Sequence, residues 1–264
     1  MLLPKGFIAC VLVLGLASAL SGQVVLSPAP SRVIGHPQAA LKTINPNYVE
    51  GKELYEPFAV AVDTTATPPV LYVADTRNSR VLAWRNAAQF ENGAPADLLI
   101  GQQDLFTTNP QGPGAEFTSG LSYPTGLAVN ARGDLFVSDA GNNRVLRYPS
   151  AFSNPQPPLP DLVIGQEDLR TRTANVDPET RTISARTLKL SSGAAVYAAP
   201  LLIDPDGNLF LSDGGNQRVL RYPAGAVGPG AAHMPRADLV IGQADFTVAS
   251  PRNPSNAADL TSMG

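Results

Sequence analysis

Short runs of apolar residues, separated by turn-forming residues, recur along the whole chain. Runs of about four to eight apolar residues that are bounded by Gly, Asn, Asp or Pro are typical of β-strands. In the middle third of the chain four such runs follow one another: Gly126–Asn130, Asp134–Asp139, Arg144–Tyr148 and Asp161–Ile164. Leu135-Phe136-Val137 has no polar alternation, which indicates a strand that is covered on both faces. We therefore predict four antiparallel strands here and no long helix.

The same pattern occurs three times. VADTRNSRVLAW, VSDAGNNRVLRY and LSDGGNQRVLRY share the order apolar, small, Asp, two variable residues, Asn, one variable residue, Arg-Val-Leu, variable, aromatic; they span Val73–Trp84, Val137–Tyr148 and Leu211–Tyr222. A second repeated fragment is a short apolar run before glycine, with its isoleucine at positions 34, 100, 164 and 241. Repetition of a four-stranded antiparallel unit predicts a β-propeller. The expected blades cover about residues 52–104, 121–168 and 195–245.

The middle repeat carries a family resemblance. Pro124 to Val129, followed by Gly133 to Asp139 and by Asn142-Asn143-Arg144-Val145, resembles an NHL repeat. From about residue 32 onward the chain resembles secreted bacterial NHL-repeat proteins. The resemblance implies an all-β fold, a β-propeller with four-stranded antiparallel blades that is usually six-bladed. It says little about function, because propellers of this kind serve as binding, sensor and enzymatic scaffolds.

One apolar fragment has no blade of its own. Val33-Ile34-Gly35 matches the outer strands of the three repeats, but no first, second and third strands precede it. In a closed ring it would complete the last blade, and the sequence Ala258–Gly264 falls where a connection to a fourth blade would begin. We therefore expect three blades plus one orphan outer strand, and hence a fragment of a longer protein or an early-terminated reading frame.

The N-terminal sequence and the composition predict where the protein is located. Residues 1–22 combine Lys5, the apolar run Phe7–Leu16 and the small residues Ala17-Ser18-Ala19, the pattern of a secretory signal peptide, which leaves one domain over residues 23–264. Cleavage would also remove Cys10, the only cysteine, and would leave 18 basic against 22 acidic residues. The resulting charge of −4 argues against a nucleic-acid partner, since such proteins carry a concentrated basic face. We predict a secreted or periplasmic protein with no membrane attachment after cleavage.

The polar residues of the repeated pattern are predicted to be structural. An Asp before a tight turn can accept N–H bonds from it, Asn tolerates the left-handed conformation that such a turn needs, and Arg can form a charge-assisted bond. A residue present in every blade is expected to serve the blade, whereas a catalytic residue is expected in one blade. The predicted structural set is Asp75, Asn78, Arg80, Asp139, Asn142, Arg144, Asp213, Asn216 and Arg218.

No motif of the sequence predicts a catalytic or metal site. Asp204-Pro205-Asp206-Gly207-Asn208 departs from a calcium loop at its sixth and twelfth positions and is better explained as a hairpin turn. His36 and His233 are the only histidines, too few for a three-ligand zinc site. The sequence therefore indicates no cofactor, although it leaves a divalent cation such as calcium open.

These observations favour an exported, non-enzymatic scaffold that meets its partner at the loop-bearing face or the mouth of the channel, because long loops on a rigid disc are where function is placed. A protein, peptide or carbohydrate ligand would suit such a surface. Two alternatives stay open: a metal-dependent enzyme resembling propeller lactonases or lyases, and the extracellular sensor domain of a larger receptor.

Overall fold

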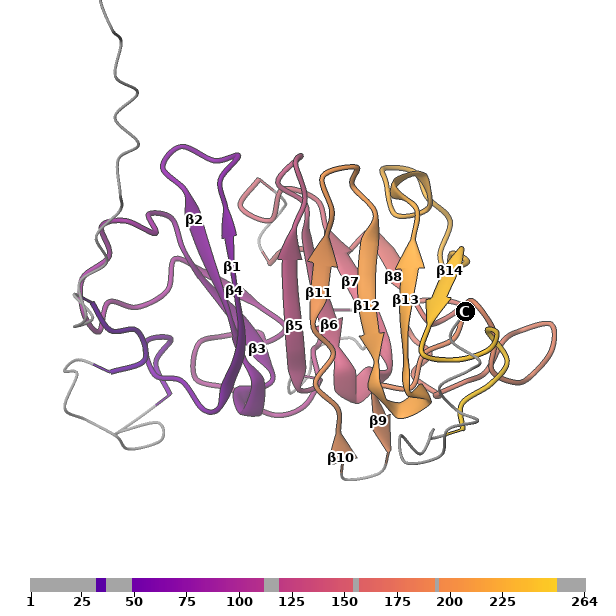
Figure 1. Ribbon diagram of the computed structural model, residues 1–264. Helices are drawn as coiled ribbons and strands as arrows, with labels where there is room; N and C mark the ends of the chain where they lie inside the picture. Colours follow the sequence, from indigo (N-terminus) through magenta and orange to yellow (C-terminus); the bar gives the residue numbers. More distant parts are fainter. Residues whose placement is uncertain (1–31, 37–48, 112–118, 154–156, 193–194, 251–264) are drawn as a thin grey trace, which may run out of the picture. The chain divides into compact units, whose positions relative to one another are not determined.

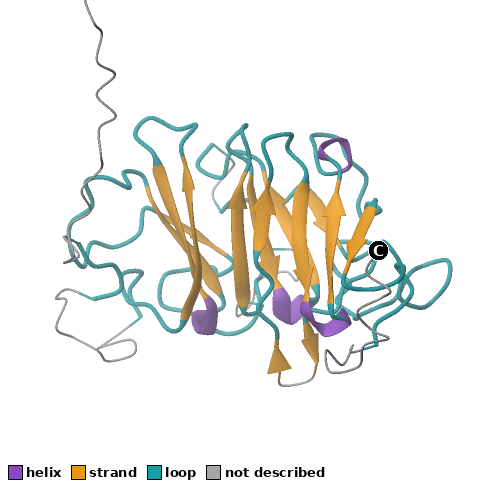
Figure 2. Cartoon of the chain, in the orientation of Figure 1, coloured by secondary structure: helices purple, strands orange, loops and turns teal. Residues whose placement is uncertain are grey.

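The computed structural model describes five stretches of the chain, residues 32–36, 49–111, 119–153, 157–192 and 195–250. The predicted signal segment and the C-terminal residues 251–264 lie outside them. The described part is almost entirely β, with three four-stranded antiparallel sheets and only short 3-10 turns between them (Figures 1 and 2). This is the predicted all-β fold with four-stranded antiparallel blades.

Each sheet follows the order of its strands in the sequence, so every strand pairs with its neighbour along the chain. Blade 1 consists of β1 (Pro57–Asp63), β2 (Val70–Asp75), β3 (Arg80–Trp84) and β4 (Leu98–Ile100). Blade 2 consists of β5 (Pro124–Val129), β6 (Leu135–Asp139), β7 (Arg144–Tyr148) and β8 (Leu162–Ile164). Blade 3 consists of β11 (Leu201–Ile203), β12 (Leu209–Asp213), β13 (Arg218–Tyr222) and β14 (Leu239–Ile241).

Apolar side chains fill the spaces between consecutive blades. One cluster joins blade 1 to blade 2 and includes Ala74, Val81, Leu127, Leu135 and Leu146. A second joins blade 2 to blade 3 and includes Phe136, Val145, Ile164, Leu209 and Leu211. Both faces of blade 2 are therefore covered, which is why its second and third strands are apolar without alternation.

The innermost strands approach so closely that glycine is required at one point. A Cβ added to Gly126 of β5 would lie 2.1 Å from the carbonyl oxygen of Ala199, just before β11. No side chain fits in that space, so the Gly of the middle repeat is explained by the packing of β5 against the start of blade 3.

The turns between second and third strands are single 3-10 turns, η1 (Thr76–Asn78), η2 (Ala140–Asn142) and η3 (Gly214–Asn216). The left-handed residue follows each turn: Ser79, Asn143 and Gln217 have φ of 52°, 53° and 55°. Our prediction that Asn78, Asn142 and Asn216 supply this conformation was wrong by one position. Those asparagines face inward, because their side chains bond the aspartate that precedes the turn.

One small element was not predicted. β9 (Ser191–Ser192) and β10 (Ala195–Val196) form a two-stranded antiparallel sheet in the connection between blades 2 and 3. The backbone amide groups of Leu190 and Ser191 both donate to Asn143 Oδ1, at 2.8 and 2.9 Å. This hairpin is thereby tied to the turn of blade 2, a long-range contact that local sequence patterns do not reveal.

Candidate functional site

The repeated aspartate of blade 2 is the acceptor at the centre of a closed polar cluster. Asp139 Oδ2 accepts from Arg144 Nε at 2.7 Å and from Asn142 Nδ2 at 2.9 Å. Its Oδ1 accepts from the backbone amide group of Ser122 at 2.7 Å. All three side chains of the motif are fully buried. The cluster therefore has no surface open to a ligand.

The other two blades repeat this geometry. The residues are Asp75, Asn78 and Arg80 in blade 1, and Asp213, Asn216 and Arg218 in blade 3. The distance from the arginine Nε to the aspartate Oδ2 is 2.7 Å in blade 1 and 2.8 Å in blade 3. The Asn side chain of each blade donates to the same oxygen. The backbone donors to Oδ1 are Tyr55 and Lys189, which belong to the connection entering each blade. The predicted N–H donors from the turn itself are thus replaced by donors from that connection.

The arginine of each cluster also joins the segments that enter and leave the blade. Arg144 donates from Nη2 to the carbonyl of Gly120 at 3.1 Å, and from Nη1 to the carbonyl of Leu169. Burial raises the pKa of Asp75 and Asp213, an effect that the neighbouring arginines oppose. These residues hold strands and connections together in the geometry described, and that their role is purely structural stays a prediction.

The glutamines that follow the fourth strands make similar bonds. Gln102 Nε2 donates to the carbonyl of Ser79 at 3.0 Å and to that of Asn109 at 2.7 Å. Gln166 and Gln243 donate to the carbonyls of Asn143 and Gln217 in the same way. Each glutamine connects the end of a blade to its own left-handed turn.

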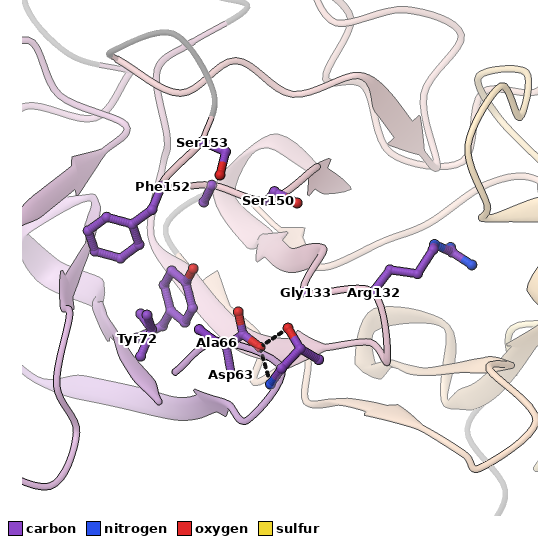
Figure 3. A pocket seen from close by; sticks show the side chains of 11 residues that line it. Asp63, Ala66, Tyr72, Arg132, Gly133, Ser150, Phe152 and Ser153 are labelled. Carbon is purple, nitrogen blue, oxygen red and sulfur yellow. Dashed lines mark hydrogen bonds between the residues drawn. The ribbon is translucent and has the colours of Figure 1, made fainter. Parts of the chain in front are cut away.

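A different set of residues surrounds a cavity at the junction of blades 1 and 2. The cavity has a volume of about 190 Å³ and lies where the loop between β1 and β2 meets the loops that follow β5 and β7. Figure 3 shows its lining, of which the residues with polar or aromatic side chains are Asp63, Thr65, Tyr72, Arg132, Ser150, Phe152 and Ser153. Its mixture of polar and aromatic side chains makes it a candidate binding site.

The polar side of the cavity is built by a local turn. Asp63, the last residue of β1, accepts from Thr65 N at 2.8 Å and from Thr65 Oγ1 at 2.6 Å, both on Oδ1. This Asx-type turn holds the carboxylate in place and leaves its second oxygen toward the cavity (Figure 3). A fixed carboxylate at this position can accept hydrogen bonds from a bound molecule.

The aromatic side of the cavity comes from both blades. The rings of Tyr72 and Phe152 lie with centroids 6.3 Å apart at an interplanar angle of 52°. Burial, with a smaller contribution from the charge of Asp63, raises the pKa of Tyr72, so its hydroxyl stays protonated and can donate. The Arg85 guanidinium lies 4.2 Å from the centre of the Phe152 ring.

Our sequence reasoning missed these residues, although a signal was present. Tyr72 pairs with Ala61 in blade 1 as Phe136 pairs with Ala128 in blade 2, so Tyr72 and Phe136 occupy equivalent positions. Blade 1 therefore has a hydroxyl group where blade 2 has none. Comparison of the repeats for the residue that departs from the pattern would have identified Tyr72.

The described residues contain no group of three or more His, Cys, Asp or Glu side chains placed to hold a metal ion. His36 is half-buried in the N-terminal segment, and His233 is exposed, with Nδ1 3.4 Å from the backbone nitrogen of Val163. The structure does not bring the two histidines into one site. No helix in the described residues is long and apolar enough to cross a membrane.

Comparison with known proteins places a repeat on blade 2. The NHL repeat family model matches residues 121–148, which contain β5, β6 and β7. Blade 2 is therefore similar to an NHL repeat. Blades 1 and 3 repeat its strand order and its buried Asp-Asn-Arg cluster, so the three sheets are blades of one propeller type. No curated protein matches the chain.

Several solved structures are weakly similar to this chain. Hydrazine synthase of Kuenenia stuttgartiensis is 13% identical, with 78% of this chain and 41% of that chain covered and a TM-score of 0.40. A streptogramin B lyase is 9% identical over 81% of this chain and 58% of its own, with a TM-score of 0.34. A Lactobacillus plantarum protein is 13% identical over 72% and 43%, with a TM-score of 0.40. This chain thus spans less than two thirds of each of these structures.

Proposed function

We propose that this chain is an exported, non-enzymatic propeller scaffold that binds a small neutral ligand bearing several hydroxyl groups, such as one sugar unit of a carbohydrate, in the cavity between blades 1 and 2. The observation that carries the proposal is the lining of that cavity. It combines a fixed carboxylate, a tyrosine hydroxyl and two serines with an aromatic ring.

The hydrogen-bonding groups suit a polyol. Asp63 accepts from a ligand hydroxyl, while the Tyr72 hydroxyl donates to another. Ser150 and Ser153 can both donate and accept. The apolar C–H face of a sugar ring can lie against Phe152, since aromatic rings supply large contact areas at binding sites.

The charges around the cavity favour a neutral ligand. Asp63 repels an anion from one side. The guanidinium of Arg85, which lies over the Phe152 ring, disfavours a cation next to that ring. In Figure 3 the Arg132 side chain extends away from Asp63, and its Nε pairs with Asp134 at 3.2 Å. The Asp63 carboxylate therefore disfavours an anionic ligand, and the Arg85 guanidinium disfavours a cation near the Phe152 ring.

The size of the cavity favours one ring. Its volume of about 190 Å³ is below the ~300 Å³ at which pockets for drug-sized ligands usually begin. At ~30 Å³ per water molecule it has room for roughly six waters. A single sugar unit is of that order, whereas a peptide or protein would have to engage the surrounding loops.

Export is supported by the N-terminal pattern of a positive residue, an apolar run and small residues. The non-enzymatic part of the proposal rests on the cavity itself. Asp63 is the only carboxylate of its lining, whereas most glycoside hydrolases place two carboxylates at the scissile bond.

Isothermal titration of the purified chain with a panel of neutral mono- and disaccharides tests the proposal. Tyr72→Phe removes one hydroxyl and keeps the ring that blade 2 has at this position, so it should weaken binding about 3- to 10-fold, the worth of one neutral hydrogen bond. Phe152→Ala should abolish measurable binding. Asp206→Asn, in the corresponding but exposed loop of blade 3, is the matched control and should bind like the wild type.

Two results would contradict the proposal. One is that no neutral saccharide binds the folded wild-type chain. The other is that Tyr72→Phe and Phe152→Ala bind a saccharide as tightly as the wild type does, because binding would then occur elsewhere.

A further inference from the structure

A second cavity lies between blades 2 and 3, and side chains of both charges line it. It has a volume of about 380 Å³. It lies where the loop between β13 and β14 meets the residues that follow β8 and the connection that leads into blade 3. Its lining includes Glu167, Pro178, Arg186, His233, Met234 and Arg236. None of these residues lines the cavity between blades 1 and 2.

Backbone hydrogen bonds fix the loop that forms one wall of this cavity. The backbone nitrogen of Met234 donates to the carbonyl of Val163 in β8 at 2.8 Å. The backbone nitrogen of Ala237 donates to the carbonyl of Ala185, in the connection that leads into blade 3, also at 2.8 Å. Because both ends of the segment 234–237 are bonded to other parts of the fold, this wall is formed before any ligand binds.

Comparison of the three blades shows that Arg236 is specific to blade 3. In each blade an aspartate directly precedes the fourth strand, at positions 97, 161 and 238. Two residues before it, blade 1 has Pro95, blade 2 has Leu159 and blade 3 has Arg236. A residue that every blade needs would recur in every blade. The guanidinium at this position is therefore not required to build a blade.

His233 keeps a structural bond and adds a second nitrogen. Five residues before the same aspartate, blade 1 has Asn92 and blade 3 has His233. The Val33 backbone nitrogen donates to Asn92 Oδ1 at 2.9 Å, and the Val163 backbone nitrogen donates to His233 Nδ1 at 3.4 Å. Because Nδ1 accepts this bond, the neutral imidazole carries its proton on Nε2, which is then a donor that Asn92 has no equivalent of.

The charges of the lining leave one group of each sign for a ligand. Arg186 Nη1 pairs with Glu179 Oε1 at 3.0 Å, so the charge of Arg186 is already balanced. Within the described stretches of the chain, Glu167 and Arg236 form no ion pair with each other or with another side chain. An anion would be repelled by Glu167 and a cation by Arg236, whereas a molecule that carries both charges can bind both groups.

The rest of the lining is apolar. Met234, which is 7% exposed, and Pro178 and Pro235 offer hydrocarbon surface to a ligand. The volume of about 380 Å³ is within the ~300–1,000 Å³ of pockets for small molecules. At ~30 Å³ per water molecule, the cavity holds roughly twelve waters. It therefore has room for an amino acid with a branched side chain or for a dipeptide.

We infer that the cavity between blades 2 and 3 binds a small zwitterion with an apolar side chain, an amino acid or a dipeptide. Glu167 accepts hydrogen bonds from the ammonium group of the ligand. Arg236 and the Nε2 of His233 donate to its carboxylate, since a guanidinium group matches the geometry of a carboxylate. The hydrocarbon side chain lies against Met234. This site is separate from the proposed saccharide site, so the two proposals can fail separately.

Isothermal titration of the purified chain with matched ligands tests the inference. The zwitterions are L-leucine and L-alanyl-L-leucine, which differ in the separation of their charges. Two analogues carry one charge each: 4-methylpentanoate is leucine without its ammonium group, and L-leucinamide has no carboxylate. We expect at least one zwitterion to bind, and both single-charge analogues to bind at least about tenfold more weakly than L-leucine if L-leucine is that ligand, because each lacks a charge-assisted hydrogen bond.

Variants of the lining make the outcome specific. Glu167→Gln and Arg236→Gln should each weaken binding of the zwitterion about 10- to 100-fold. Glu167→Gln should leave the affinity for 4-methylpentanoate unchanged or higher, because that analogue has no ammonium group. His233→Asn introduces the residue of blade 1, so it should keep the bond from Val163 and weaken binding only about 3- to 10-fold. Glu91→Gln, an exposed carboxylate in the corresponding loop of blade 1, is the matched control and should bind like the wild type.

Several results would overturn the inference. One is that neither zwitterion binds a wild-type chain whose buried Trp84 shows the emission of a folded protein. Another is that the single-charge analogues bind as tightly as the zwitterions, which would mean that only one of the two charges matters. Binding of a zwitterion that Glu167→Gln and Arg236→Gln leave unchanged, but that Phe152→Ala abolishes, would place the ligand in the cavity between blades 1 and 2 instead.

Discussion

Replacing Arg144 by alanine should destabilise the fold strongly without altering the lining of the cavity between blades 1 and 2. The Arg144 side chain is fully buried and its guanidinium bonds Asp139, Gly120 and Leu169. Its removal leaves the buried carboxylate of Asp139 with neutral donors alone, and leaves two carbonyl groups without this donor.

The magnitude follows from that burial. An exposed ion pair is worth about 0–1 kcal/mol, but removing one partner of a buried pair costs about 3–5 kcal/mol. The sequence by itself suggests about 1–3 kcal/mol, the cost for a partly buried bond. Because the side chains of Arg144 and Asp139 are both 0% exposed, we expect the higher range of about 3–5 kcal/mol. This is a large share of the ~5–15 kcal/mol that stabilises a typical domain.

Urea unfolding, followed by the fluorescence of Trp84, measures this free energy of unfolding. Trp84 is the only tryptophan and is buried in blade 1, so its emission reports loss of the fold. Arg221→Ala is the matched control, since the Arg221–Asp238 pair of blade 3 is 35% and 41% exposed and should cost less than about 1 kcal/mol. Arg144→Lys keeps the positive charge but loses the planar guanidinium group with its several donors, so its loss of stability should fall between those of Arg144→Ala and Arg221→Ala.

A loss below about 1 kcal/mol for Arg144→Ala would refute this reasoning, as would a loss equal to that of the control. Loss of ligand binding with unchanged stability would show instead that the repeated cluster is a site and that its structural interpretation is wrong.

Three further predictions follow from other contacts. Gly126→Ala should lower the free energy of unfolding by at least about 1–3 kcal/mol, because its Cβ would lie 2.1 Å from the Ala199 carbonyl oxygen; an unchanged urea midpoint would contradict this. Arg147→Met, which removes a buried guanidinium bonded across the interface of blades 2 and 3, should cost about 2–5 kcal/mol in the same assay, and a value near zero would contradict it. Hydrogen bonds from Asn208 hold the pKa of Asp204 below its ordinary value of 3.8. The stability that this turn contributes is therefore present above pH 3.8 and is lost as the pH falls through the lowered pKa. NMR titration of Asn208→Ala should show a higher pKa for Asp204, and an unchanged pKa would refute the assignment.

The repeated residues made most of the fold predictable. The periodic Asp-x-x-Asn-x-Arg pattern indicates a turn between two strands in each blade, and the structure places Asp139 opposite Arg144 in that register. The apolar run before Gly165 likewise predicts a fourth strand, which is β8. These features repeat because each blade solves the same local packing problem, so one sequence reports them three times.

The remaining features depend on contacts between distant residues. The β9–β10 hairpin is held by Asn143, almost fifty positions earlier in the chain, and no local pattern contains that bond. The cavity likewise combines Asp63 and Tyr72 of blade 1 with Phe152 from the loop after β7. Local periodicity identifies each strand but does not say which loop residues of one blade meet the next.

The most direct test of the proposed function is a crystal structure of the chain soaked with the saccharide that binds most tightly in titration. We predict density for one sugar ring in the cavity between blades 1 and 2, with a hydroxyl within hydrogen-bonding distance of Asp63 and the ring face against Phe152. Density for the sugar at another surface, with this cavity filled only by water, would contradict the proposal.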